Sequence, residues 1–206
     1  MEIINKYFVQ LSPEQEEQFR KLPAIYGNLN SKVNLISRKD IDHLYERHVL
    51  HSLSIANFID FQKGTHILDA GTGGGFPGIP LSILFPEVHF TLVDSTGKKI
   101  NCVHEVIKEL GLKNVVALQS RVEEIKNTYD YIISRALISL PQFYKWVRPL
   151  VSKHGFNYLP NGIIYLKGGD FIEDLREINM PFYLYNLSDF FEEEYFQTKK
   201  LVFITI

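Results

Sequence analysis

HILDAGTGGGFPGIP, the stretch His66–Pro80, is the part of this chain around which the rest is organised. A short apolar run ends at Asp69, a glycine-rich turn follows, and an apolar segment of about helical length begins near Ile79. This order predicts a strand, a loop and a helix, which together bring backbone N–H groups to the edge of a parallel sheet. Glycine suits such a loop because it reaches positive φ easily and has no Cβ to keep a ligand away.

A second acidic residue supports a ligand site at this edge. Asp94 closes the next apolar run and lies 19 residues after Gly75, close to the offset at which an acid binds ribose hydroxyls. The sequence therefore predicts a nucleoside-bearing cofactor. Gly73–Gly78 satisfies G-x-G-x-x-G, but Asp69 would face a dinucleotide's pyrophosphate unfavourably, and two prolines delay the helix. A carboxylate there instead suits a cofactor with a cationic or amine-bearing end, and the stretch resembles the D-x-G-x-G loop of S-adenosylmethionine-dependent methyltransferases.

Composition fits one globular domain. The chain has 206 residues, 45% hydrophobic and 22% charged, with a net charge of −2. The expected organisation is one domain over 1–206, with a helical extension at 1–60 and a core at 64–206. The single cysteine, Cys102, fits a reducing cytoplasm, and we expect neither a signal peptide nor a membrane span. Any RNA contact needs a local basic face, because the net charge provides no global one.

The first sixty residues read as helical. Ser12 and Gln15 form a capping box with a proline between them, which predicts a helix start. Pro23 is expected to kink or split this helix. A connector is expected over Asn28–Ser37, and a second helix from about Asp40.

From residue 64 the pattern alternates between strand and helix. The predicted strands are His66–Ala70, Val88–Val93, Asn114–Leu118, Tyr129–Ser134 and Gly162–Lys167. The predicted helices are Ile79–Phe85, Lys98–Leu110, Leu140–Val147 and Phe171–Ile178. This alternation predicts an α/β fold with a parallel sheet covered on both faces. Two last strand-like runs, Pro181–Phe191 and Lys199–Ile206, have no predicted helix between them and should form an antiparallel pair.

Several motifs together resemble one family. They are NLIS at residues 34–37, ERHVL at 46–50, DAGTGGGFPGIP at 69–80, LVDSTGKK at 92–99, SRVEE at 120–124, ISRA at 133–136 and LKG at 166–168. The chain resembles the glucose-inhibited division protein B (RsmG) family, bacterial 16S ribosomal RNA (guanine-N7) methyltransferases, from its N-terminal helices to Lys167. This implies a class I, Rossmann-like methyltransferase fold with an N-terminal helical extension and an antiparallel C-terminal strand pair. His51 departs from the family, which usually has aspartate there.

The resemblance also implies site residues. The cofactor S-adenosylmethionine would contact Gly71, Gly73, Phe76, Asp94, Val122, Glu123 and Arg135. The candidates for RNA contact are Arg47, His48, Lys98, Arg135 and Lys167, with Lys32, Arg38, Lys39 and Lys99 as further local basic residues. Each has a simpler alternative: the glycines as turn residues, Phe76 as core, Glu123 as a solvated charge, and the basic residues as ordinary surface charges. The partner is 16S ribosomal RNA or the small ribosomal subunit, and we expect a monomer.

The expected chemistry needs no catalytic side chain. The sequence lacks both the Asp/Asn-Pro-Pro-Tyr/Phe motif of amino-directed methyltransferases and a cysteine at the active face. Guanine N7 has an in-plane lone pair, so alignment and desolvation suffice. No metal site is expected, because His48 and His51 lack the ligands to complete one. Trp146 and Phe143 are expected in the core. A small-molecule methyltransferase of this fold, and a cofactor-binding RNA-associated protein without turnover, remain alternatives.

Overall fold

The computed structural model describes residues 1–37, 39–135, 138–169 and 172–206. The strands are β1 (His66–Ala70), β2 (His89–Asp94), β3 (Val115–Gln119), β4 (Tyr131–Arg135), β5 (Gly162–Gly168), β6 (Phe182–Asn186) and β7 (Lys199–Thr205). The α-helices are α1 (Glu2–Tyr7), α2 (Pro13–Asn30), α3 (His51–Phe58), α4 (Gly78–Leu84), α5 (Gly97–Leu110), α6 (Leu140–Val147) and α7 (Ile172–Ile178). The predicted strands and helices of the core are confirmed to within a few residues. Residue 171, the predicted start of the last helix, and Arg38 lie outside the described residues.

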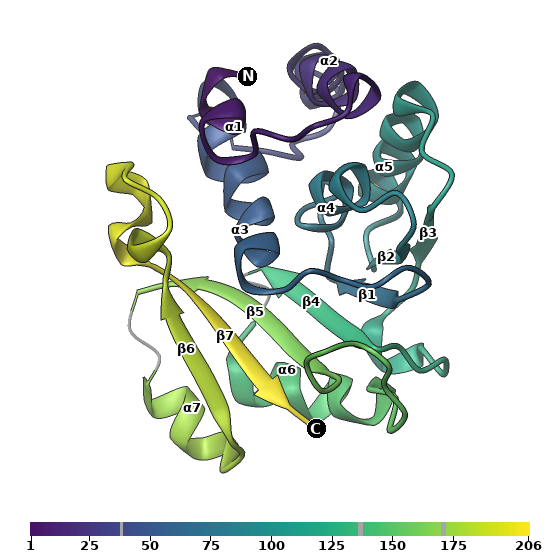
Figure 1. The fold of residues 1–206 in the computed structure, drawn as a ribbon. Coiled ribbons are helices and arrows are strands. Elements are labelled where there is room, and N and C mark those ends of the chain that lie inside the picture. Colours follow the sequence, from purple (N-terminus) through teal and green to yellow (C-terminus); the bar gives the residue numbers. More distant parts are fainter. Residues whose placement is uncertain (38, 136–137, 170–171) are drawn as a thin grey trace.

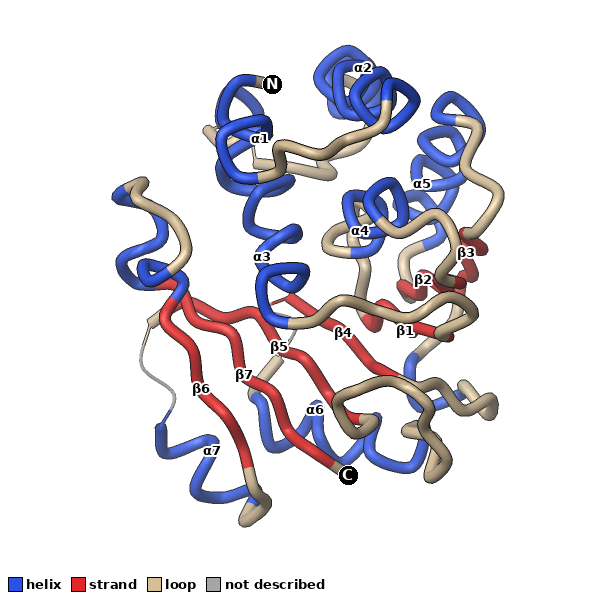
Figure 2. The backbone as a smooth tube through the Cα atoms, viewed as in Figure 1, coloured by secondary structure: helices blue, strands red, loops and turns tan. Residues whose placement is uncertain are grey.

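The strands form one sheet in the order β3-β2-β1-β4-β5-β7-β6. β1 to β5 pair in parallel, whereas β7 pairs antiparallel with both β5 and β6 (Figure 2). The predicted antiparallel C-terminal pair is therefore confirmed. Because β1 to β5 run the same way, the loops that follow them lie along one edge of the sheet. The glycine-rich loop follows β1, near the middle of that edge.

Helices cover both faces of the sheet. Figure 1 shows α2, α3, α4 and α5 on one side and α6 and α7 on the other. Each face has its own apolar core. The larger core joins the N-terminal helices to α4 and α5, with Phe19, Leu50 and Phe90 fully buried. The smaller core packs α6 against the opposite face, with Phe143 and Val147 fully buried.

The predicted split of α2 does not occur: the helix runs continuously through Pro23. Proline has no N–H to donate to the carbonyl four residues earlier, which here belongs to Phe19. The hydroxyl of Tyr45 donates to that carbonyl at 2.9 Å instead. The buried carbonyl is satisfied from another segment, and this long-range contact is why the sequence pattern misplaces the break.

The helix expected from Asp40 has three parts. A 3₁₀ helix (Ile41–His43) leads into a π-helix (Leu44–Leu50), which continues as α3. π-helical turns are rare and often occur at functional sites. This one carries Arg47 and His48, two of the predicted RNA-contacting residues.

The segment between β6 and β7 differs from the prediction. β6 ends at Asn186, and two 3₁₀ helices follow, Leu187–Asp189 and Glu194–Thr198. Phe191 and Phe196 are buried here, which turns the chain inward rather than extending the strand. The second 3₁₀ helix brings Tyr195 beside the π-helix, since the Tyr195 hydroxyl lies 3.4 Å from the Arg47 carbonyl oxygen.

Candidate cofactor and substrate site

The glycine-rich loop is shaped by glycines with two different roles. Gly71 and Gly73 adopt φ values of 75° and 58°, which other residues rarely adopt. Gly75 combines a φ of 96° with close packing, and Gly78 is needed for packing alone. A Cβ on Gly75 would lie 2.6 Å from Ile79, and one on Gly78 would lie 2.7 Å from the Asp69 carboxylate. The loop therefore tolerates side chains at neither kind of position.

Asp69 binds the loop itself rather than pointing toward an open ligand site. Its side chain is fully buried, and Oδ2 accepts hydrogen bonds from the Thr72 hydroxyl at 2.6 Å and the Gly78 N–H at 2.8 Å. Oδ1 has no partner among the described residues. Burial raises the pKa of Asp69 to about 7, although the two hydrogen bonds act to lower it. This corrects the interpretation of Asp69 as a group placed for a cationic cofactor end, because these contacts join the loop to the start of α4.

The carboxylate of Asp94, at the end of β2, is fixed in position by two backbone N–H groups. Its Oδ2 accepts from the Gly73 N–H at 3.0 Å, and its Oδ1 accepts from the Thr96 N–H at 2.8 Å. Each carboxylate oxygen accepts about two hydrogen bonds, so both keep capacity for a ligand's hydroxyls. The glycine loop and the acidic residue, separate in sequence, thus form one preformed unit.

A first hollow opens over this unit. It is lined by Gly71, Asp94, Ser95, Thr96, Lys99, Ser120, Val122, Ile138 and Trp146. Three of the predicted cofactor residues, Gly71, Asp94 and Val122, therefore lie together. Gly73 contributes through its bond to Asp94. Glu123 is exposed on a short 3₁₀ helix (Val122–Glu124) and does not line the hollow.

Phe76 lies away from this hollow. It is 3% exposed, and its ring packs 4.9 Å from the Tyr26 ring and 5.1 Å from the His48 ring, centroid to centroid. The Tyr26 hydroxyl donates to the Gly74 carbonyl at 2.7 Å. The guanidinium of Arg135 lies 5.3 Å from the Phe76 ring centroid. Phe76 thus joins the glycine loop to Arg135 instead of facing the lined hollow.

Arg135, at the end of β4, is bound by the π-helix. Its Nη1 donates to the Arg47 carbonyl at 3.1 Å, and its Nη2 lies 2.9 Å from His48 Nδ1. Arginine can only donate, so His48 Nδ1 accepts and Nε2 carries the ring proton. Burial, with Arg135 nearby, lowers the pKa of His48 to about 3, so the ring is neutral. Among the described residues, no carboxylate forms an ion pair with Arg135.

A second hollow lies beside Arg135. It is lined by Asp40, Arg47, His48, His51, Arg135, Leu166, Lys167, Gly168, Tyr195 and Lys199. Four of these residues are cationic and only Asp40 is anionic. Arg47 Nε, His48 Nε2 and His51 Nε2 are buried without a hydrogen-bond partner among the described residues. Arg47 Nε and His48 Nε2 are donors, and together with the cationic side chains of this hollow they suit an anionic ligand.

The predicted RNA-contacting residues are only partly brought together. Arg47, His48, Arg135 and Lys167 line the second hollow, where Lys167 also forms a 2.8 Å ion pair with Asp174. Lys98 is exposed on the first turn of α5 and lines neither hollow, whereas its neighbour Lys99 lines the first. Sequence reasoning missed Ile138 and Tyr195 as lining residues. Position after the fourth strand was an available signal for Ile138, but no local signal places Tyr195.

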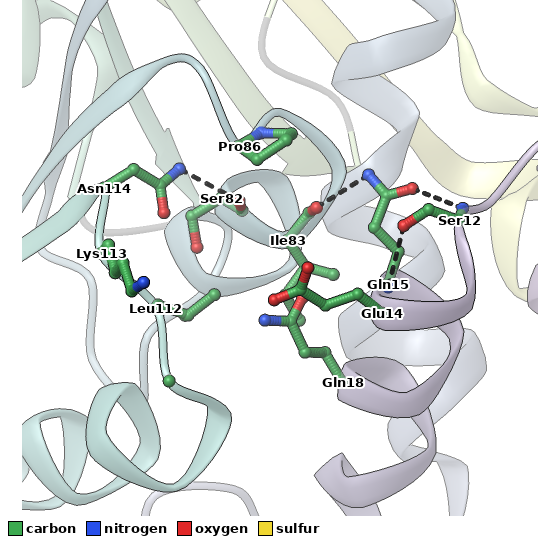
Figure 3. Close-up of a pocket in the computed structure, with 11 residues that line it drawn as sticks. Ser12, Glu14, Gln15, Gln18, Ser82, Ile83, Pro86, Leu112, Lys113 and Asn114 are labelled. Atoms are coloured by element: carbon green, nitrogen blue, oxygen red, sulfur yellow. Dashed lines mark hydrogen bonds between the residues drawn. The ribbon is translucent and has the colours of Figure 1, made fainter.

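A third cleft, between α2, α4 and the end of α5, is not a comparable site (Figure 3). Its polar groups are used to hold the helices together. Gln15 Nε2 donates to the Ile83 carbonyl at 3.0 Å, and Asn114 Nδ2 donates to the Ser82 carbonyl at 3.1 Å. This cleft also lies away from the glycine loop.

In the described part of the chain, no group of three or more His, Cys, Asp or Glu residues is arranged to hold a metal ion. No helix there is both long enough and apolar enough to cross a membrane.

Comparison with known proteins gives a consistent family. Residues 15–179 match the GidB model, described as rRNA small subunit methyltransferase G. A protein of Cytophaga hutchinsonii named ribosomal RNA small subunit methyltransferase G is 55% identical, covering 99% of each chain. One of Bacteroides fragilis with the same name is 50% identical, covering 100% of each chain.

Solved structures show the same fold at much lower identity. A SAM dependent methyltransferase from Aquifex aeolicus superposes with a TM-score of 0.58 at 17% identity, covering 82% of this chain and 98% of that one. The expected class I, Rossmann-like fold is confirmed by this likeness and by the strand order.

Proposed function

Because the chain belongs to the GidB family, rRNA small subunit methyltransferase G, we propose that it transfers a methyl group from S-adenosylmethionine to guanine N7 in 16S ribosomal RNA. One observation carries this proposal. The hollow that contains Asp94 and the hollow rich in cations lie along the same edge of the sheet. The first suits a nucleoside cofactor, and the second suits the phosphates of RNA.

The cofactor is held by the residues of the first hollow. Asp94 accepts the ribose hydroxyls, the backbone at Gly71 approaches the ligand closely, and Val122 contacts the base. S-adenosylmethionine supplies an electrophilic methyl group on a sulfonium. Phe76, Glu123 and Arg135 keep their predicted cofactor roles only as hypotheses, since none of them lines this hollow.

The RNA is positioned by the second hollow. Arg135 and Arg47 neutralise backbone phosphate, so binding should weaken steeply as salt rises. The partly buried guanidinium of Arg135, which has no carboxylate partner among the described residues, is available for that role. We further propose that the protein acts as a monomer in the cytoplasm, with residues 1–206 as a single domain; its lone cysteine fits that compartment.

The test is methyl transfer from labelled S-adenosylmethionine to 16S ribosomal RNA, and to small subunits, that lack the modification. Cleavage at 7-methylguanosine maps the product. Label at one guanine is the expected result. Label in a metabolite, with RNA untouched, would instead favour a small-molecule methyltransferase of this fold. Cofactor binding without transfer to any RNA would favour a non-catalytic RNA-associated protein.

A further inference from the structure

The indole of Trp146 forms one wall of the first hollow, although the sequence pattern assigns it to the core. α6 buries Leu140, Phe143 and Val147 against the sheet, each with no exposed surface. Trp146 lies on the flank of this helix, half-buried, and lines the hollow together with Ile138. The buried residues of α6 therefore fix where the indole stands.

The first hollow has two chemically different ends. Asp94, Ser95 and Thr96 form the polar end, at the end of β2, whereas Ile138 and Trp146 form the apolar end, beyond β4; β1 lies between these two strands in the sheet. A nucleoside has the same asymmetry, with a hydroxyl-rich ribose attached to a flat base. When the ribose binds Asp94, the base extends toward the apolar end.

The indole has no ring partner of its own. Among the described residues it makes no ring contact and no hydrogen bond, and part of its surface stays accessible. Stacking of a base on an aromatic side chain contributes about 1–3 kcal/mol, which is about 5- to 150-fold in affinity. Trp146 also borders a separate depression beside α7, and in the first hollow a purine would meet a ring that has no aromatic partner among the described residues.

An RNA base is a poorer occupant of this hollow than a cofactor. Both oxygens of Asp94 retain capacity for a hydroxyl, which matches a ribose with two free neighbouring hydroxyls. A nucleotide inside an RNA chain has only its 2′-hydroxyl free, because the 3′-oxygen is esterified. The polar end therefore selects a terminal nucleoside.

We propose that Trp146, with Ile138, is the purine-binding wall of the cofactor site. This inference rests on the proposed function, because it assigns a residue to the cofactor of that reaction. Trp146 determines affinity for the adenine end of the ligand and takes no part in methyl transfer itself.

The first experiment uses the unmodified protein. Trp146 is the only tryptophan in the chain, so intrinsic tryptophan fluorescence reports on this position alone. Adding S-adenosylhomocysteine should change the emission, and the change should be half-complete at the dissociation constant measured by calorimetry and saturate above it. Calorimetric binding without any change in emission would overturn the purine wall. No calorimetric binding at all would overturn the proposed function and the wall with it.

Variants then separate the purine from the rest of the ligand. Trp146→Ala should weaken S-adenosylhomocysteine binding about tenfold, and Trp146→Phe about threefold or less. The control Tyr158→Ala removes a ring that is 93% exposed and precedes β5 at the opposite edge, and should leave binding unchanged. The affinity for 5′-methylthioadenosine, which lacks the amino-acid end, should fall by the same factor in Trp146→Ala.

Two outcomes of this series would overturn the wall while leaving the proposed function intact. One is an unchanged dissociation constant for both ligands in a folded Trp146→Ala protein. The other is a raised KM for RNA with unaltered cofactor affinity, which would make Trp146 a platform for an RNA base.

Discussion

Replacing Asp69 with asparagine should change how stability depends on pH. Asp69 is fully buried, and its Oδ2 accepts from Thr72 and Gly78. Asparagine keeps an oxygen acceptor for both donors and cannot ionise. The variant therefore mimics the protonated form of the acid, while the loop and the start of α4 remain joined.

The magnitude follows from the shift in the pKa of Asp69, from 3.8 to about 7 in the folded protein. Between these values the folded protein holds the proton and the unfolded chain has lost it. The contribution of Asp69 to stability is therefore fully present below the unfolded pKa and is lost as pH rises through the folded pKa. Integrated from pH 5 to pH 7, the contribution of Asp69 to the free energy of unfolding falls by about 2 kcal/mol.

The assay is urea unfolding at pH 5 and pH 7. Other groups also titrate in this range, so the informative quantity is the difference between wild type and Asp69→Asn at each pH. The variant should gain about 2 kcal/mol relative to wild type on going from pH 5 to pH 7. The exposed Asp60→Asn is the control and should follow wild type. If the difference in the free energy of unfolding between wild type and Asp69→Asn is the same at pH 5 and pH 7, the reasoning is refuted.

The remaining predictions concern the two hollows and the continuity of α2. Gly71→Val should abolish S-adenosylhomocysteine binding in calorimetry, because valine resists a φ of 75° and adds bulk at the hollow; unchanged affinity would remove Gly71 from the site. Arg135→Ala should lower kcat/KM for RNA strongly while changing the free energy of unfolding little, and it should reduce the salt slope of RNA binding by about 1. Full activity of this variant would remove Arg135 from the site. Tyr45→Phe should cost about 1–3 kcal/mol in urea unfolding because the Phe19 carbonyl loses its donor, whereas the exposed Tyr158→Phe should cost almost nothing.

Local patterns predict most of the core elements. β1 was predicted over the observed residues, and α6 likewise, because buried apolar runs there are bounded by glycine, proline or polar residues. The predictions are wrong where a residue from a distant segment satisfies a group that local sequence would leave without a hydrogen bond. Pro23 remains inside α2 because Tyr45 supplies the missing donor. Nothing in the residues around Pro23 indicates that donor.

Local motifs predict which residues lie at strand ends, but they do not predict the contacts between residues that are distant in the sequence. Motifs placed Gly71, Asp94 and Val122 at strand ends, and the structure brings them to one hollow. The misread residue was Asp69, whose hydrogen bonds are to the protein itself. The sequence offers no sign that the π-helix would hold Arg135, since that contact joins residues 88 positions apart.

The two histidines beside Arg135 bear on how the reaction proceeds. His48 Nδ1 is engaged by the Arg135 guanidinium, and the pKa of His48 is lowered to about 3. His51 Nδ1 faces the Tyr195 hydroxyl at 3.2 Å, and burial lowers the pKa of His51 well below its usual value. Neither ring therefore offers an effective general base at neutral pH. Guanine N7 already presents a lone pair in the plane of its ring and needs no base, so the surroundings of Arg135 suit a reaction driven by alignment and desolvation.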